Sequence, residues 1–386
     1  MRRRRARSAL RHALLLGAAA CATGSPAGDS LPAPSPTVGD AFFVAGYHAY
    51  WTGESWRDYP WDALHQLYFF EIEIGSDGAV ADGHGWPHAW SALLARAREA
   101  GVSVVPTISM HDAAAFQQLF TQPERVQRLV DDLIALLTRM PDLGGLHLDF
   151  EVFQPVELAA RDGYTAFVAR LASSMDALDP SLSVSVFAMA FDDDEVYNER
   201  ALAELADFLV VQGYDFHHAT GTRAGPLAAL HGWGRLNWAS VVDRFVALGV
   251  PPRKLVMSVP MYGYEWPVAG PEAGAPTRGP GVILPLAPAP DIVPELPRAR
   301  ARVAEHGVQR DAESGAPFYT FRSDSGWHQG WLEDAESLRA KYRFVRERGL
   351  GGVAVFPLAY GDEAMWRALR SELNRPRGGT PRARSR

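Results

Sequence analysis

The chain has 386 residues, of which 47% are hydrophobic and 22% are charged, with 35 glycines and 28 prolines. This composition excludes a disordered or collagen-like chain, and the length allows two domains or one large barrel. The formal net charge is −7, but the charges are unevenly distributed along the chain. Of the 38 basic residues, 11 lie in the two terminal segments 1–20 and 375–386, which contain no acidic residue. The body between these segments therefore carries 27 basic and 45 acidic residues. So acidic a body is a poor nucleic-acid binder, since binding to phosphates needs a basic face.

The chain begins with the layout of a secretory signal. A cluster of arginines precedes a short apolar run, residues 13–20, that ends in three alanines. This run is well below the roughly 20 residues of a membrane-spanning helix, so we expect a signal peptide over residues 1–20 and an exported protein. Cys21 follows directly, which resembles a bacterial lipoprotein signal with Cys21 as the lipidated residue, although Ala18 stands where Leu is usual. Ordinary cleavage before an unmodified Cys21 is the alternative.

The segments that flank the body lack the pattern of a folded element. Residues 21–40 are rich in Pro, Ser, Gly and Ala and indicate a tether, and residues 375–386 indicate a basic disordered tail. We therefore expect one folded domain over residues 41–374, held at the bacterial cell envelope by a lipid anchor or otherwise periplasmic or extracellular. A single cysteine excludes an internal disulfide framework and a Cys-based zinc cluster.

The body alternates short β-branched or aromatic runs with longer amphipathic runs. Eight strands, each followed by helical material, predict an α/β fold, a (β/α)8 TIM barrel. The expected strands are 42–50, 67–74, 103–109, 144–151, 183–190, 208–215, 255–263 and 352–359, and the expected helices include 123–139, 162–178, 238–248 and 333–348. Residues 264–318 are too long for an ordinary connection, so we expect a small insertion after the seventh strand, with a short helix near 297–306.

The functional site of such a barrel lies at the C-terminal ends of its strands. Two carboxylates, Asp149 and Glu151, are expected there among aromatic side chains. Sugar faces stack on aromatic rings, and cleavage of a glycosidic bond needs a proton donor, so these ends indicate a sugar site. The other residues expected at these ends are Tyr47, Trp51, Tyr214, Asp215, Tyr262, Trp266 and Phe356.

The segment 144–151 (GGLHLDFE) carries the strongest signal. The two-residue period of a strand turns His147, Asp149 and Glu151 into the barrel, where three ionisable groups are costly unless paired. The segment resembles the fourth-strand signature of glycoside hydrolase family 18, the chitinase-like family, with its two last acids at Asp149 and Glu151. Gly144 and His147 replace two earlier aspartates of the family pattern.

The resemblance extends over residues 42–370. Residues 211–217 (VQGYDFH), 258–264 (SVPMYGY) and 351–356 (GGVAVF) are similar to the family's sixth, seventh and eighth strands, whereas its third-strand Ser-x-Gly-Gly is absent. The most similar subgroup is the bacterial spore-cortex-lytic N-acetylglucosaminidases.

The resemblance implies retaining hydrolysis assisted by the substrate's own 2-acetamido group, by a monomer without metal or cofactor. The substrate would be a β-linked N-acetylglucosamine polymer, peptidoglycan or a chitin-type chain, with peptidoglycan favoured by the envelope location. Glu151 would protonate the leaving oxygen, and Asp149 and Tyr214 would hold the acetamido group. The expected sugar-binding residues are Tyr47, Gln212, Asp215, Tyr262 and Phe356, the last in place of the family's Trp.

Other interpretations stay open. A non-catalytic, lectin-like glycan-binding lipoprotein on the same fold is the main alternative, although the retained Glu151 argues against it; an envelope scaffold with a vestigial site is another. The carboxylate pair could be a buried structural network, and Tyr214 a core residue. Residues 192–195 favour a solvated acidic loop over a calcium site, and the pairs 111–112 and 217–218 favour surface or supporting roles over metal binding. If His147 titrates in the working pH range, it would draw Asp149 away from Glu151; otherwise it is a silent neutral side chain.

Overall fold

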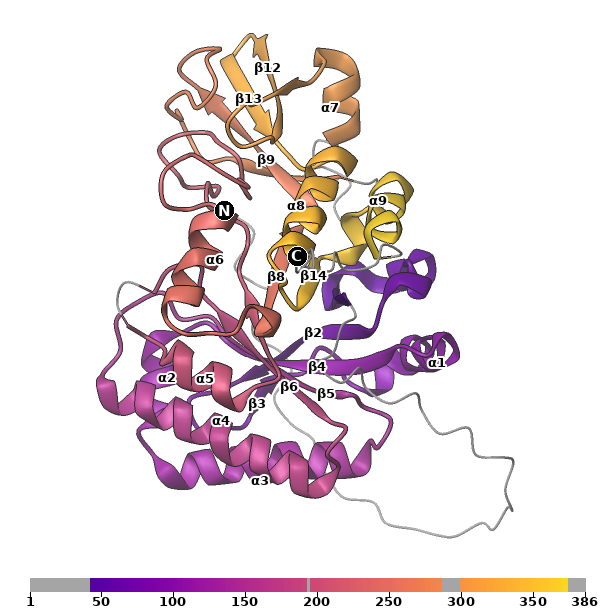
Figure 1. Ribbon diagram of the computed structural model, residues 1–386, viewed down its shortest axis with the longest axis vertical. Coiled ribbons are helices and arrows are strands. Elements are labelled where there is room, and N and C mark those ends of the chain that lie inside the picture. Colours follow the sequence, from indigo (N-terminus) through magenta and orange to yellow (C-terminus); the bar gives the residue numbers. More distant parts are fainter. Residues whose placement is uncertain (1–41, 193–194, 287–298, 374–386) are drawn as a thin grey trace, which may run out of the picture. The chain divides into compact units, whose positions relative to one another are not determined.

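The computed structural model describes residues 42–192, 195–286 and 299–373 (Figure 1). The expected signal peptide, tether and basic tail, with Cys21, lie outside these residues. None of the helices in the described part of the chain is long and apolar enough to cross a membrane.

Eight parallel strands close a barrel. Each strand pairs in parallel with the next in the order β1, β2, β4, β5, β6, β7, β8, β14, and β14 pairs with β1 to complete the ring. The expected fold class and all eight expected strands are therefore confirmed. The strands are β1 (Phe43–Ala49), β2 (Gln66–Ile74), β4 (Ser103–Met110), β5 (Gly145–Phe150), β6 (Ser183–Ala188), β7 (Phe208–Val211), β8 (Leu255–Pro260) and β14 (Gly352–Phe356), and a short β3 (Val80–Asp82) pairs with β2.

Helices cover the outside of the barrel because each has one apolar stripe (Figure 1). In α3, Pro123 occupies the first turn and buried residues recur at helical spacing, from Val126 to Leu137. Asn237 caps α6, and Asp334 forms a capping box with Ser337 at α8. The helices are α1 (Ser91–Ala100), α2 (Ala113–Phe120), α3 (Pro123–Arg139), α4 (Leu158–Leu178), α5 (Glu199–Leu205), α6 (Trp238–Ala247), α8 (Ala335–Glu347) and α9 (Glu363–Leu373).

The alternation of side chains along the strands produces two apolar layers. In β1, Phe43, Ala45 and Tyr47 belong to a cluster inside the barrel, and Val44 belongs to the larger core between strands and helices. At the start of β5 only glycine fits, since Gly145 has φ 138° and a Cβ there would lie 1.9 Å from the Ser183 carbonyl oxygen. Close pairing of β5 with β6 therefore depends on this glycine.

The insertion after β8 is a second, antiparallel sheet with the strand order β10, β9, β13, β12, β11. It runs from Tyr262 to Trp331, so it is longer and more regular than the expected segment 264–318. The stacked rings of Phe318 and Trp331, 4.6 Å apart, contribute to its core. Its strands are β9 (Tyr262–Val268), β10 (Val282–Pro285), β11 (Gln309–Arg310), β12 (Pro317–Ser323) and β13 (Gly326–Trp331), and its helix is α7 (Ala299–His306).

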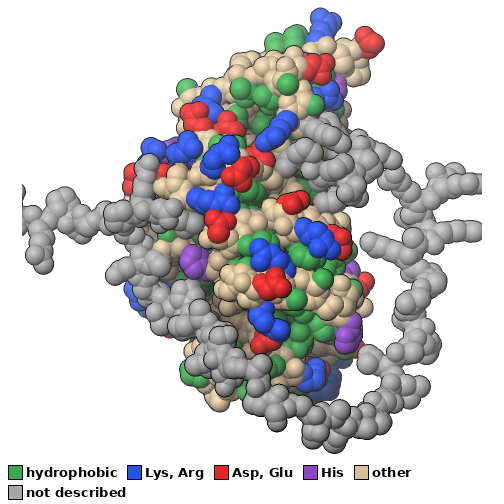
Figure 2. Space-filling model, turned by 90° about the vertical axis from the view of Figure 1, so that its right-hand side faces the viewer, with side chains coloured by type: hydrophobic (Ala, Val, Ile, Leu, Met, Phe, Trp, Pro, Cys, Tyr) green, Lys and Arg blue, Asp and Glu red, His purple; other side chains and the backbone are tan. Residues whose placement is uncertain are grey.

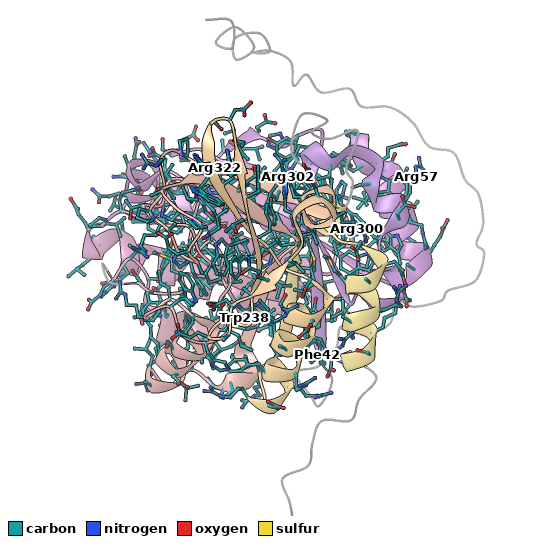
Figure 3. All side chains as sticks on the ribbon, turned by 90° about the horizontal axis from the view of Figure 1, so that it is seen from above. Phe42, Arg57, Trp238, Arg300, Arg302 and Arg322 are labelled. Carbon is teal, nitrogen blue, oxygen red and sulfur yellow. The ribbon has the colours of Figure 1, made fainter. Side chains whose placement is uncertain are left out.

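Ion pairs connect α7 to other parts of the chain, and charged side chains lie on the molecular surface. Arg302 of α7, labelled in Figure 3, pairs with the buried Glu265 of β9 at 2.9 Å, and Arg300 of the same helix pairs with Asp362. On the face drawn in Figure 2, basic and acidic side chains of the described residues are interspersed rather than gathered by sign.

Candidate active site

A cavity of about 320 Å³ opens at the C-terminal ends of the barrel strands. Its size suits a sugar-binding pocket lined by aromatic side chains with a few polar groups. The structure brings together in it all eight residues expected to carry catalysis and sugar binding, together with Trp51. These eight are Tyr47, Asp149, Glu151, Gln212, Tyr214, Asp215, Tyr262 and Phe356.

Strand β5 delivers the two carboxylates. Its apolar residues, such as Leu148 and Phe150, pack into the outer core, which leaves Asp149 facing the barrel interior and Glu151 just beyond the strand. The Asp149 side chain is 4% exposed and that of Glu151 is 24% exposed. Both acids can therefore meet a ligand from the cavity, while Asp149 remains shielded from bulk water.

Burial governs the protonation of this pair. Burial raises the pKa of Asp149 well above its usual range, and the charge of Glu151 raises it further. Burial likewise raises the pKa of Glu151 to about 7, with His111 opposing the rise and Asp215 and Glu71 adding to it. Because two neighbouring carboxylates resist ionising together, the pair titrates as a unit and keeps a proton available near neutral pH. Such a proton is what a general acid needs.

His147 lies beneath the pair and stays neutral. Its Nε2 lies 2.9 Å from the Tyr47 hydroxyl and its Nδ1 lies 3.0 Å from the Ser185 hydroxyl, while Nε2 remains 3.9 Å from Asp149. Complete burial lowers the pKa of His147 to about 3. Of the two alternatives left open for His147, the structure therefore supports the neutral side chain over one that titrates in the working range and draws Asp149 away.

The segment after β7 contributes another part of the cavity lining. The indole N–H of Trp238 on α6 donates to the Gly213 carbonyl at 2.7 Å, which fixes the backbone between Gln212 and Tyr214. Asp215 accepts a hydrogen bond from the Tyr262 hydroxyl at 2.9 Å, and burial raises the pKa of Asp215 to about 6.

An aromatic wall completes the pocket. The ring of Phe356 stacks parallel to Tyr214, with centroids 6.0 Å apart, and meets Tyr47 edge-on at 5.4 Å. Tyr214 lines the cavity rather than filling a core, and the 40% exposed Trp51 lies at the pocket wall. Such rings can stack on the apolar faces of sugars.

Trp266, which the sequence placed near the strand ends as either a site residue or a core residue, lies outside the cavity. It lies further along β9 than Tyr262 and Tyr264, which line the cavity. Its ring is fully buried in the second sheet, and its N–H donates to the Ala219 carbonyl at 3.2 Å. The strand carries this side chain past the pocket.

Several lining residues were not anticipated from the sequence. Two of them, Tyr264 and Ile283, come from the second sheet, whose strands were not predicted. Phe70 could have been found, because it alternates with Tyr68 on the inner face of a predicted strand. The remaining additions are Phe187, Ser258, Pro357 and Tyr360.

An irregularity in β2 brings a further acid to the site. The pairing of β2 with β4 shifts register between Phe69 and Ile72, which both pack in the outer core. Such a bulge re-aims the residues between its ends. The Oε2 atom of Glu71 lies 3.0 Å from the Nε2 atom of His111, at hydrogen-bonding distance. His111 Nδ1 lies 3.8 Å from Glu151 Oε2.

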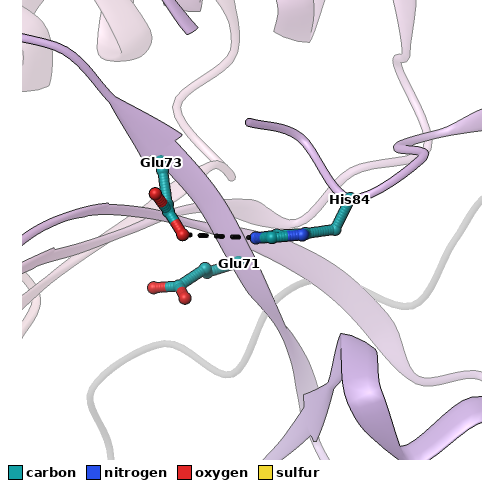
Figure 4. Close-up of side chains that lie close together, drawn as sticks. All are labelled: Glu71, Glu73 and His84. Atoms are coloured by element: carbon teal, nitrogen blue, oxygen red, sulfur yellow. Dashed lines mark ion pairs between the residues drawn. The ribbon is translucent and has the colours of Figure 1, made fainter. Parts of the chain in front are cut away.

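One group of side chains in the described residues could hold a metal ion, namely Glu71, Glu73 and His84 (Figure 4). Their candidate ligand atoms lie within 4.8 Å of one another. Each also has a partner within the protein: His84 contacts Glu73 at 3.4 Å and Asp82 at 3.5 Å, and Glu71 contacts His111. These contacts form two separate groups, one around His84 and one between Glu71 and His111, and they account for the arrangement.

Comparison with known proteins identifies the family. Residues 9–361 match the glycosyl hydrolases family 18. The chain belongs to this family. The family expected from the sequence is therefore confirmed.

Two curated relatives come from Bacillus subtilis (strain 168). The chain is 27% identical over 304 residues to a putative sporulation-specific glycosylase, YdhD, which covers 76% of this chain and 65% of that protein. It is 25% identical over 263 residues to a cortical fragment-lytic enzyme, and this match covers 67% of this chain and 56% of that enzyme. The chain thus spans less than two thirds of the length of these relatives.

A solved structure agrees with the barrel. The C-terminal domain of a putative chitinase from Desulfitobacterium hafniense DCB-2 superposes with a TM-score of 0.72 at 22% identity, covering 86% of this chain and 99% of that domain. At this identity the likeness supports the fold and nothing further.

Proposed function

We propose that this family 18 member hydrolyses β-linked N-acetylglucosamine polymers by a substrate-assisted, retaining mechanism. The observation that carries the proposal is the coupled pair Asp149 and Glu151 in an aromatic cavity, with burial holding the pKa of Glu151 at about 7. A carboxyl group with that pKa can give up a proton at neutral pH and take it back later in the cycle.

In the first step, the acetamido oxygen of the bound sugar attacks its own anomeric carbon. The glycosidic bond breaks and the leaving oxygen takes the proton of Glu151. Asp149 and Tyr214 orient the acetamido group and stabilise the positive charge that develops on it. In the second step, water attacks the anomeric carbon and the bond from that carbon to the acetamido oxygen breaks, which regenerates the acetamido group. The Glu151 carboxylate takes a proton from the attacking water, so the acid is restored and the sugar keeps its original configuration.

The walls of the cavity place the sugar for this chemistry. Phe356 forms the floor on which the reacting sugar stacks, and Tyr214 lies parallel to it. Asp215, held by Tyr262, faces the cavity with Gln212 and can accept hydrogen bonds from sugar hydroxyls.

The substrate is peptidoglycan or a chitin-type chain, and peptidoglycan is favoured because one relative is named a cortical fragment-lytic enzyme. The test is to incubate the protein with peptidoglycan and with chitin oligomers and to identify the reducing ends released. We expect Glu151→Gln to lower the rate by about 10²–10⁴-fold, because the amide keeps the shape and has no proton to give. Glu157→Gln, at an exposed position six residues along, is the matched control.

Two results would overturn this assignment. Near-wild-type turnover by Glu151→Gln would show that Glu151 is not the general acid. If the wild type binds oligosaccharides but releases no new reducing ends, the lectin-like alternative would be favoured. Two features of the sequence support that alternative: Phe356 stands in place of the family's Trp, and two aspartates of the fourth-strand pattern are replaced.

We also propose export and lipid anchoring through Cys21, supported by the arginine cluster, the short apolar run and the alanines before this cysteine. Lipidation at one residue would carry the whole anchor, so Cys21→Ala should move the protein from the membrane fraction to the soluble fraction. Equal membrane association of both forms would contradict the anchor and leave the hydrolase proposal untouched.

A further inference from the structure

We propose that His111 is a positioning residue for the general acid, held by Glu71 so that a positive charge stays beside Glu151 through the catalytic cycle. This inference rests on the proposed function. It adds a residue that is not itself part of the family's strand motifs.

The geometry places one imidazole between two carboxylates. His111 directly follows β4, the strand that lies between β2, which carries Glu71, and β5, which leads to Glu151. Its Nε2 lies 3.0 Å from Glu71, and its Nδ1 lies 3.8 Å from Glu151. A neutral ring has one N–H and must turn a lone pair toward one of these acids. A doubly protonated ring offers an N–H to both.

Glu71 is suited to hold this charge. Its side chain is 7% exposed, and a buried carboxylate requires a cationic or hydrogen-bonding partner. The bulge in β2 directs it toward the end of β4, where His111 lies. The hydrogen bond with Glu71 raises the pKa of His111 to about 9, against the opposing effect of burial, and Glu151 and Asp149 add to the rise.

The charges around Glu151 explain what His111 contributes. Burial and the nearby acids make it costly for Glu151 to lose its proton, whereas the His111 charge favours the carboxylate that forms when the proton leaves. The ionisable groups that face Glu151 from the surrounding elements are Tyr47 of β1, Glu71 of β2, His111 after β4, Asp149 of β5, Tyr197 after β6, and Tyr214 and Asp215 after β7. Within this set His111 supplies the positive charge.

Removing that charge should therefore make Glu151 a weaker acid. For two charges about 4 Å apart and partly open to water, the effect is about one pH unit. The basic limb of kcat/KM, which reports loss of the Glu151 proton, should move up by about that amount in His111→Gln. The plateau rate should fall as well, because the carboxylate formed on proton transfer loses its partner.

The experiment compares pH profiles of kcat/KM for the wild type, His111→Gln and His111→Lys. The lysine keeps a charge and should leave the basic limb near its wild-type position, which a loss of packing alone would not do. His88→Gln, at an exposed histidine outside the cavity, is the matched control. A basic limb that is superimposable in wild type and His111→Gln would overturn the inference.

A second measurement needs no activity. Titration of the His111 ring by NMR should give a pKa well above the usual 6.5 in the wild type, and a pKa at least one unit lower in Glu71→Gln or, if that variant does not fold, in Glu71→Asp. An ordinary pKa in the wild type would overturn the inference. If the wild type hydrolyses neither polymer, the proposed function fails and this inference fails with it. If the wild type hydrolyses either polymer but the basic limb of kcat/KM does not move in His111→Gln, only the inference on His111 fails.

Discussion

Two histidines on neighbouring barrel strands show how surroundings decide the chemistry of a side chain. His147 is enclosed between Tyr68, Tyr47 and Ser185, and burial lowers its pKa to about 3. His111 is partly open to water beside Glu71, and that hydrogen bond raises its pKa to about 9. The sequence motif draws attention to His147, because it replaces an aspartate of the family pattern. In the structure, however, the histidine whose surroundings favour a positive charge beside Asp149 and Glu151 is His111.

A neutral His147 should have no influence on the pH profile. We expect His147→Asn to leave the acid limb of kcat/KM in place while lowering the free energy of unfolding by about 1–3 kcal/mol, since the Tyr47 and Ser185 hydroxyls lose a buried partner. The checks are the pH profile and thermal melts of both forms. A downward shift of the acid limb would show instead that His147 is charged in the working range.

Much of the site could be predicted at the level of single residues, because strand alternation and barrel topology alone place Asp149 and Glu151 inward at one end. The protonation states could not. They depend on Glu71 and His111, whose approach follows from a bulge, and on how completely each group is buried. A two-residue period cannot indicate where a strand shifts register.

At the scale of elements, the barrel strands were predictable because each is a continuous apolar run with a helix beside it. The second sheet was not. In this sheet β9 pairs with β13, so that Trp266 lies opposite Gln329 across more than 60 residues of chain. Local sequence patterns carry no information on such distant pairing, and the segment therefore resembled a loose insertion.

This second sheet should contribute to substrate affinity, because Ile283 of β10 and Tyr264 of β9 line the cavity. We expect Ile283→Ala to weaken oligosaccharide binding by about fivefold, which corresponds to roughly 1 kcal/mol of lost apolar contact. Its exposed neighbour Val282 does not line the cavity, so Val282→Ala is the matched control. Calorimetric titration in a Glu151→Gln background, which should not hydrolyse the ligand, would measure both, and equal affinities would show that Ile283 does not contribute to binding.

At the scale of the whole molecule, the buried carboxyl groups of the proposed catalytic site lower the stability of the fold at high pH. Burial raises the pKa values of Asp149, Glu151 and Asp215 above their usual ranges, to about 7 for Glu151 and about 6 for Asp215. A carboxyl group with a raised pKa binds its proton more tightly in the folded state than in the unfolded state. The folded state is therefore favoured at low pH and loses that advantage as the pH rises through the folded-state pKa.

Glu151→Gln should consequently be more stable than the wild type, and increasingly so as the pH rises from the unfolded-state pKa of Glu151 to its folded-state pKa. Between pH 4.5, the ordinary pKa of this carboxyl group, and pH 8, above its folded-state pKa of about 7, the free energy of unfolding of Glu151→Gln should gain about 1–3 kcal/mol relative to wild type. Denaturant unfolding at pH 5 and pH 8 measures this gain, with the exposed Glu157→Gln expected to show no such difference. A gain of the same size at both pH values would mean that the amide merely packs better. A larger gain at pH 8 than at pH 5 would tie the stability cost to the same buried proton that the proposed mechanism transfers, because one desolvated carboxyl group would then account for both.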